Sequence, residues 1–124
     1  MEIKDLTFAI QAIHSKKLLY NDFLDTLYDA ILSERITSSY FSEEPCFQGL
    51  GIEDRAYWAA TIHYFCNRFG FDLPDWTMKD EYFLKEPYFS YKDNGHAQLY
   101  LIAESPREFS MRNMYISNNA FERV

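Results

Sequence analysis

The sequence predicts an all-α or mainly α protein, a single irregular bundle of about five helices that occupies residues 1–124 as one domain. Two observations support this prediction. Apolar residues recur at the helical period of about 3.6 residues in several segments, and residues that favour the start or the end of a helix flank those segments. A chain of 124 residues is also long enough to bury roughly two thirds of the surface that it exposes when unfolded.

Two amphipathic helices are predicted in the first third of the chain. Asp5 is a suitable cap for the first helix, which we expect to end near Lys16 and Lys17 and to bury Leu6, Ala9, Ile10 and Ile13. The second helix is predicted from Asn21, another favoured cap residue, to about Glu34, with an apolar face of Phe23, Leu24, Leu27, Tyr28 and Ile31. Three acidic residues, here named the acidic stripe, fall on the opposite side of this helix: Asp22, Asp25 and Asp29.

A long connection and a central helix follow. Ser, Thr, Pro and Gly interrupt the helical pattern over residues 35–51, and we expect a connection there that is anchored by Tyr40, Phe41 and Phe47. A helix is predicted from Glu53 to Phe69, closed by a left-handed Gly70. Because its apolar residues point in several directions around the axis, we expect the first two helices to pack against it.

The last third of the chain is less periodic. Pro87 is expected to end any helix that residues 77–84 form. Asn94-Gly95 is a turn signal that could close a small hairpin near residues 90–100. A helix that starts after Asn94 and runs through Ala103 is the favoured alternative.

A helix-start signal lies at Ser105-Pro106-Arg107-Glu108. We interpret it as a capping box, in which the side chains of Ser105 and Glu108 each accept a hydrogen bond from the backbone N–H of the other. This helix is expected to direct Phe109 inward. Asn118-Asn119 marks a turn or a cap for a last helical turn.

The cysteines and the apolar runs indicate the compartment. Cys46 and Cys66 match no disulfide or zinc pattern, and we expect both to be small buried hydrophobes. Charged residues interrupt any signal-peptide region in the first twenty residues, and no apolar run approaches the roughly 20 residues of a membrane span. A cytoplasmic protein is therefore expected.

The sequence contains no recognisable catalytic, cofactor or metal constellation. The histidines His14, His63 and His96 lack the paired spacing of zinc ligands, and no nucleophile motif or complete nucleotide-binding loop is present. Arg55 and His63 are too far apart for the Arg and His pair of a helical ribonuclease. We therefore predict no catalytic residue, no cofactor and no metal, and expect His63 to be a hydrogen-bonded core or interface residue.

The composition favours binding to another protein. The chain carries 11 Phe, 10 Tyr and 2 Trp at a net charge of -7, which is more rings than we expect its core to hold. Lys and Arg are not clustered, so direct binding to nucleic acid is disfavoured and a more basic protein partner is expected. Two sets of partner-binding residues are predicted: Asp22, Asp25 and Asp29, and the C-terminal set Arg107, Arg112, Asn113 and Tyr115. The structural alternatives are a solvated helix face for the first set and docking on the core for the second.

A family resemblance comes from five short segments of the C-terminal half. They are Pro74-Asp75-Trp76, Leu84 to Phe89, Ser105 to Phe109, Arg112 to Ile116, and Phe121-Glu122-Arg123. Together they resemble small uncharacterised bacterial proteins associated with toxin-antitoxin gene pairs, whose other member resembles a nucleotidyltransferase. The resemblance implies a bacterial cytoplasmic protein with a protein partner, and it transfers no catalytic residue.

Three functional hypotheses follow. The first is a non-catalytic protein-binding module, the antitoxin or inhibitory partner of a bacterial toxin. The second is an inhibitor encoded by a phage or mobile element, which imitates nucleic acid with the acidic stripe. The third is a small enzyme with a site near His63, which requires a polar pocket and a carboxylate in hydrogen-bond reach of that ring.

Overall fold

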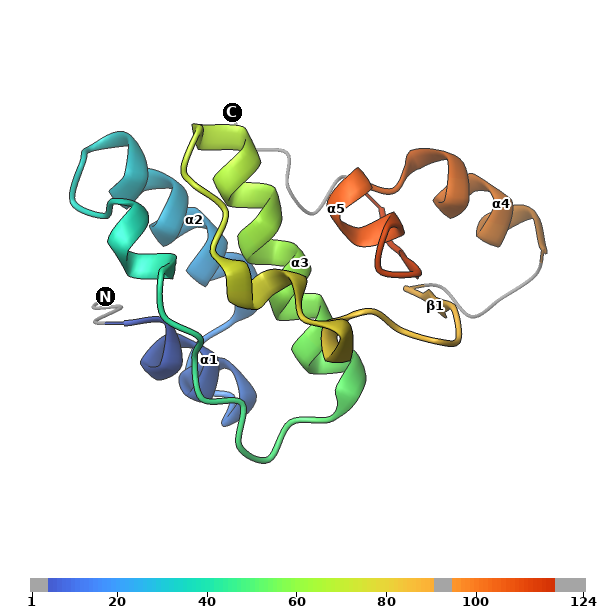
Figure 1. Ribbon diagram of the computed structural model, residues 1–124, viewed down its shortest axis with the longest axis horizontal. Coiled ribbons are helices and arrows are strands. Elements are labelled where there is room, and N and C mark those ends of the chain that lie inside the picture. Colours follow the sequence, from blue (N-terminus) through green and yellow to red (C-terminus); the bar gives the residue numbers. More distant parts are fainter. Residues whose placement is uncertain (1–4, 91–94, 118–124) are drawn as a thin grey trace. The chain divides into compact units, whose positions relative to one another are not determined.

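The computed structural model describes residues 5–90 and 95–117, and these are mainly helical, as predicted (Figure 1). The described residues form two compact units, residues 5–48 and residues 49–117, here called the first and the second unit. The first unit contains helices α1 (Leu6–His14) and α2 (Tyr20–Leu32) and the 3-10 helix η1 (Ser38–Phe41). The second unit contains α3 (Ile52–Phe69), η2 (Asp75–Met78), η3 (Asp80–Tyr82), β1 (Tyr88–Phe89), α4 (Gly95–Glu104), α5 (Arg107–Ser110) and β2 (Met114–Tyr115).

Helix α1 has the predicted cap. The Asp5 carboxylate accepts a hydrogen bond from the backbone N–H of Phe8 at 2.7 Å, which satisfies one of the free donors at the helix start. Of the four residues expected in the core, Leu6, Ala9 and Ile10 are buried, and Ile13 is half-buried.

Helix α2 differs from the prediction at both ends. The carbonyl of Leu19 accepts the first helical hydrogen bond, from Phe23, so Asn21 lies inside the helix and the prediction that it is the cap was wrong. The helix ends at Leu32 and not at Glu34, because Glu34 has a left-handed backbone with φ 62°. The predicted apolar face is confirmed, with Tyr28 half-buried and these residues buried: Phe23, Leu24, Leu27 and Ile31.

The connection after α2 is anchored by aromatic residues, as expected. Phe41 and Phe47 are buried, and Tyr40 is half-buried. Cys46, however, is exposed, whereas Cys66 is buried, so the expectation for Cys46 was wrong. The chain around Cys46 is not helical, and burial there alternates along the chain: Pro45 and Phe47 are buried on either side of it.

Helix α3 is the central element of the second unit. It starts one residue earlier than predicted and ends, as predicted, at a left-handed Gly70 with φ 72°. Its buried residues lie around much of its circumference, and η2, η3 and α5 pack against it. The packing of the first two helices on α3 concerns both units and stays a prediction.

The rest of the second unit combines short elements. No longer helix forms over residues 77–84; the chain there contains the end of η2 and the short η3, and the Thr77 hydroxyl donates a hydrogen bond to the carbonyl of Pro74. Residues 95–104 are helical, which confirms the favoured alternative over a hairpin there; Asn94 and Asn118-Asn119 lie outside the described residues. Strands β1 and β2 pair in parallel, with Phe89 opposite Tyr115.

Helix α5 begins at Arg107, one residue later than predicted, and lacks the predicted capping box. No side chain caps it, because the Ser105 hydroxyl instead accepts a hydrogen bond from the Ile116 backbone N–H at 2.8 Å. The Glu108 carboxylate accepts from the Asn67 side chain at 2.7 Å. Both side chains of the expected box are thus used in contacts between distant segments. None of the helices over the described ranges is both long and apolar enough to span a membrane.

The left-handed Gly70 gives the first prediction. A Cβ added there meets no atom within 4 Å, so only the backbone opposes a side chain. We expect Gly70→Ala to lower the free energy of unfolding by about 1 kcal/mol in a urea titration, whereas Gly70→Asn costs less, because Asn tolerates this conformation better. Equal stability of the alanine variant and the unaltered protein would contradict this assignment.

Candidate functional site

A fully buried arginine, Arg112, organises the second unit. Its terminal nitrogens donate hydrogen bonds to the carbonyl oxygens of Glu108 and Thr77, both at 2.7 Å, and to Nδ1 of His63 at 3.0 Å. The guanidinium carbon lies 4.9 Å from the centre of the Phe83 ring. Arg112 therefore joins α3, η2, α5 and the segment after η3.

This guanidinium is buried without an opposite charge. Among the described residues no carboxylate forms an ion pair with Arg112, and its Nε atom has no hydrogen-bond partner. Burial lowers the pKa of Arg112 to about 10, and the charge of Glu108 acts in the opposite direction. The group stays charged at neutral pH, so its desolvation is offset mainly by the two carbonyl groups and the aromatic ring.

His63 is held by the same contact. An arginine can only donate, so Nδ1 of His63 accepts and carries no proton. Burial lowers the pKa of His63, and the charge of Arg112 lowers it further. This confirms the expectation of a hydrogen-bonded core histidine. In the described part of the chain, the group bonded to the ring is a guanidinium and not the carboxylate that the enzyme hypothesis requires.

The C-terminal set of predicted partner-binding residues is corrected by these contacts. Arg112 is fully buried, so it cannot meet a partner, and the prediction for it was wrong. Asn113 has a left-handed backbone with φ 65°, and its side chain donates to the Leu84 carbonyl at 3.4 Å. Tyr115 is half-buried against Phe89. These residues dock on their own unit, which was the structural alternative; Arg107 alone of the set is exposed.

A sequence signal for the burial of Arg112 exists. Phe109, which was expected to face inward and is buried, lies three residues before it in a helical turn, and residues at that spacing share a face. The acceptors could not be foreseen, because two of them are backbone carbonyls. One of those carbonyls belongs to Thr77, 35 positions away.

A groove of about 660 Å³ lies in the second unit, a size typical of ligand-binding clefts. Among the described residues, four exposed carboxylates line it, together with one exposed ammonium group, Lys85. Its walls are formed by half-buried apolar side chains, three of them aromatic. The described residues that line it are Ile52, Glu53, Asp80, Glu81, Phe83, Leu84, Lys85, Glu86, Pro87, Tyr88, Phe89 and Gln98.

The buried contacts hold the aromatic wall of this groove in place. Phe83 packs on the Arg112 guanidinium, and Phe89 stacks on Tyr115 with ring centres 5.1 Å apart. The backbone of β1 is fixed by hydrogen bonds from Tyr88 to Asn113 at 2.9 Å and from Ser90 to Tyr115 at 3.0 Å. The C-terminal set thus supports the wall of the groove.

The acidic rim affects the third ring of the wall. Burial raises the pKa of the Tyr88 hydroxyl, and the negative charges of Glu53 and Asp54 raise it further. Tyr88 is therefore neutral at physiological pH and can donate a hydrogen bond. The fold brings Glu53 together with Asp80 and Glu81, which are more than 25 positions away in the sequence, in one groove.

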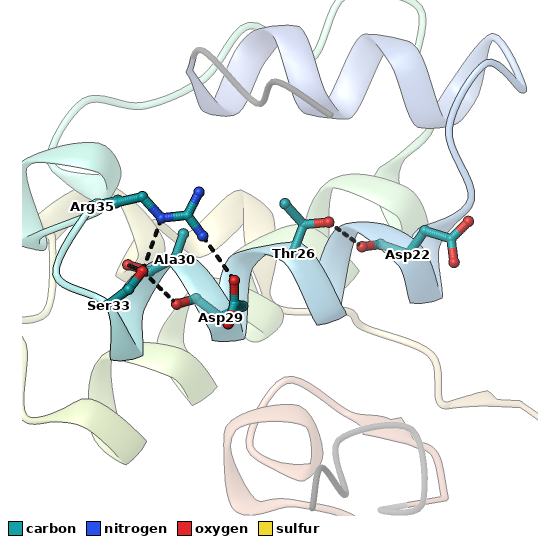
Figure 2. A network of polar contacts seen from close by, with 6 residues as sticks. All are labelled: Asp22, Thr26, Asp29, Ala30, Ser33 and Arg35. Atoms are coloured by element: carbon teal, nitrogen blue, oxygen red, sulfur yellow. Dashed lines mark hydrogen bonds and ion pairs between the residues drawn. The ribbon is translucent and has the colours of Figure 1, made fainter.

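The acidic stripe lies on α2 as predicted, with all three side chains exposed. Figure 2 shows Arg35 reaching back to Asp29, where its Nη2 atom lies 2.8 Å from a carboxylate oxygen, and also contacting Ser33. Asp22 accepts a hydrogen bond from Thr26 through its backbone carbonyl, at 2.8 Å (Figure 2). The charge of Asp29 is thus partly neutralised, which weakens the stripe as an imitation of a phosphate backbone.

A second hollow, of about 690 Å³, lies in the first unit. Its lining includes hydroxyl groups and charges of both signs, such as Asp5, Glu43 and Arg35. The Tyr40 hydroxyl is buried there without a hydrogen-bond partner among the described residues, and burial raises its pKa. This mixed lining favours no single class of ligand, so the groove is the better candidate.

The remaining surface includes exposed aromatic and apolar side chains. Among the described residues Phe8 and Tyr100 are exposed and many other aromatic side chains are only half-buried, so part of the aromatic surface reaches the solvent, as expected. Exposed apolar side chains do gather on α4, at Leu99, Tyr100 and Ile102. No cluster of three or more metal-ligating side chains occurs within residues 5–90 and 95–117.

The Arg112 contacts give the second prediction. Arg112→Ala leaves buried carbonyls without donors, and we expect it to lower the free energy of unfolding by about 3 kcal/mol in a urea titration. The matched control, Arg107→Ala, removes an exposed arginine from the same segment and is expected to change stability by less than about 0.5 kcal/mol. Equal losses of stability in the two variants would show that the buried contacts of Arg112 do not stabilise the fold.

The lowered pKa of His63 gives the third prediction. Because the unfolded chain binds a proton near pH 6.5 more readily than the folded one, the contribution of His63 is fully present above about pH 6.5 and is lost as the pH falls. We expect His63→Gln to lose less stability than the unaltered protein between pH 7 and pH 5, measured by urea titration. A pH dependence in His63→Gln equal to that of the unaltered protein would contradict this assignment.

Comparison with known proteins supplies no relative. No family model, no curated protein and no solved structure matches the chain. The resemblance of the C-terminal segments to proteins of toxin-antitoxin pairs therefore stays a prediction. The acidic groove of the second unit is the candidate functional site on its geometry alone.

Proposed function

We propose that this protein is a non-catalytic binding module and that the groove of its second unit takes a basic segment of another protein. The observation that carries the proposal is the combination of an acidic rim with an aromatic wall in one groove. A solvated acidic surface needs no apolar wall, and a purely apolar cleft needs no ring of carboxylates. Together the two features suit a chain segment that presents both positive charge and apolar surface.

The contacts that hold the aromatic wall of the groove favour a binding site that is largely formed before the partner binds. Phe83 packs on Arg112, and Phe89 stacks on Tyr115. Strand β1 is hydrogen-bonded to β2. A wall that is ordered before binding loses little conformational entropy when the partner arrives. The carboxylates of the rim would speed association with a basic partner and exclude acidic ones.

The partner to test first is a bacterial toxin, with this protein as its antitoxin or inhibitory partner. This part of the proposal comes from the resemblance of the C-terminal segments and from the net charge of -7. Co-purification of the tagged full chain from its native cells, followed by identification of the bound protein, tests it. Recovery of a basic partner supports the proposal, and recovery of the chain alone contradicts it.

The groove gives the fourth prediction. Glu81→Gln with Glu86→Gln neutralises two exposed rim charges, and we expect the co-purified partner to bind about ten-fold more weakly in calorimetry at low salt. The loss should shrink at high ionic strength, because salt screens the rim charges in both proteins.

A matched control separates the groove from the acidic stripe. Asp22→Asn with Asp25→Asn makes the same change in net charge on α2, and we expect it to leave the affinity within about two-fold. Weaker binding of this control with full binding of the groove variant would move the interface to the stripe and overturn the assignment to the groove.

A further inference from the structure

The groove contains the two kinds of group that recognise an organic cation. Its rim presents the carboxylates of Glu53, Asp80, Glu81 and Glu86, and its wall presents half-buried aromatic rings. A cation held over an aromatic face gains roughly 0.5 to 1 kcal/mol at an exposed site and more where water is excluded. A groove that presents both carboxylates and aromatic rings is therefore expected to bind different basic side chains with different affinities.

We infer that the group anchored in the groove is the guanidinium of an arginine in the partner segment. This inference rests on the function proposed above and adds the identity of the anchoring side chain. The guanidinium is planar, so one face can stack on a ring while its edge pairs with two carboxylate oxygens. A lysine ammonium is compact and strongly hydrated, and it loses more by leaving water for an aromatic wall.

One ring of this wall is already in contact with a guanidinium of the protein itself. Arg112 lies with its guanidinium carbon 4.9 Å from the centre of the Phe83 ring, and Phe83 lines the groove. Phe89 is covered on one side by Tyr115, at an angle of 26° between the rings. The Phe83 ring thus already accommodates one guanidinium, which supports the choice of a second guanidinium as the occupant of the groove.

Lys85 adds an independent observation. It is exposed and is the single cationic residue among the described residues that line the groove. Its ammonium opposes a positively charged occupant, so its removal should strengthen binding without disturbing the aromatic wall. An apolar or acidic occupant would show no gain, or a loss, in the same experiment.

The fifth prediction uses two capped nonapeptides that are identical except that one carries three arginines and the other three lysines. Binding to the full chain is followed by NMR shifts of backbone amides in residues 80–90. We expect the arginine peptide to bind about five-fold tighter, the gain that a cation and ring contact supplies. Equal affinities would overturn the inference and leave the proposed function standing; a lack of shifts with both peptides would contradict the proposed function as well.

Two substitutions complete the test. Lys85→Gln alters only an exposed side chain, and we expect it to strengthen binding of both peptides by about three-fold. Phe89→Leu keeps an apolar wall and removes the ring, so it should abolish the preference for arginine; Phe8→Leu, at an exposed ring of the first unit, is the matched control. An unchanged preference for arginine in Phe89→Leu would overturn the inference. Weaker binding of the peptides to Lys85→Gln would also overturn it, and this measurement does not depend on whether Phe89→Leu folds.

Discussion

The second unit depends on one buried charge. The guanidinium of Arg112 reaches His63 on α3, the carbonyl of Thr77 on η2 and the carbonyl of Glu108 on α5. Since the described residues pair no carboxylate with it, these neutral acceptors and the Phe83 ring must replace the water that the charge has lost. A buried cation satisfied in this way fixes the relative positions of its acceptors, because each of them has to lie within hydrogen-bond distance of one planar group.

The position of the groove follows from that constraint. Arg112 packs on the Phe83 ring, and the residues that follow it, Asn113 and Tyr115, contact Leu84 and Phe89. The same segment carries rim charges next to its rings, so its fixation places carboxylates beside an aromatic wall. Arg112, Asn113 and Tyr115 therefore contribute both to the fold and to the shape of the candidate site, although they were predicted to contact the partner directly.

Periodicity predicted most of the helices, because a helix that buries one face shows it in the sequence. Helix α3 and its closing Gly70 are examples, as is the Asp5 cap of α1. Predictions for single side chains failed where a side chain bonds to a residue that is distant in the sequence instead of a neighbouring one or the solvent. Ser105 was expected to cap α5 and bonds to Ile116 instead, and Arg112 was expected on the surface because arginine is common at interfaces. The rim of the groove could not be predicted, because Glu53 and Glu86 are far apart in the sequence and line one groove only in the folded chain.

Negative charge alone does not identify a binding site in this protein. The acidic stripe of α2 and the rim of the groove both present exposed carboxylates, but Arg35 already binds Asp29 in the stripe, on a helix face opposite the apolar residues. Among the described residues that line the groove, Lys85 is the one cationic group and stands against four acidic ones, and three of the lining side chains are aromatic. Carboxylates beside a half-buried apolar wall act through a lower effective dielectric than carboxylates in open water, so the same number of charges attracts a cation more strongly in the groove than on the stripe.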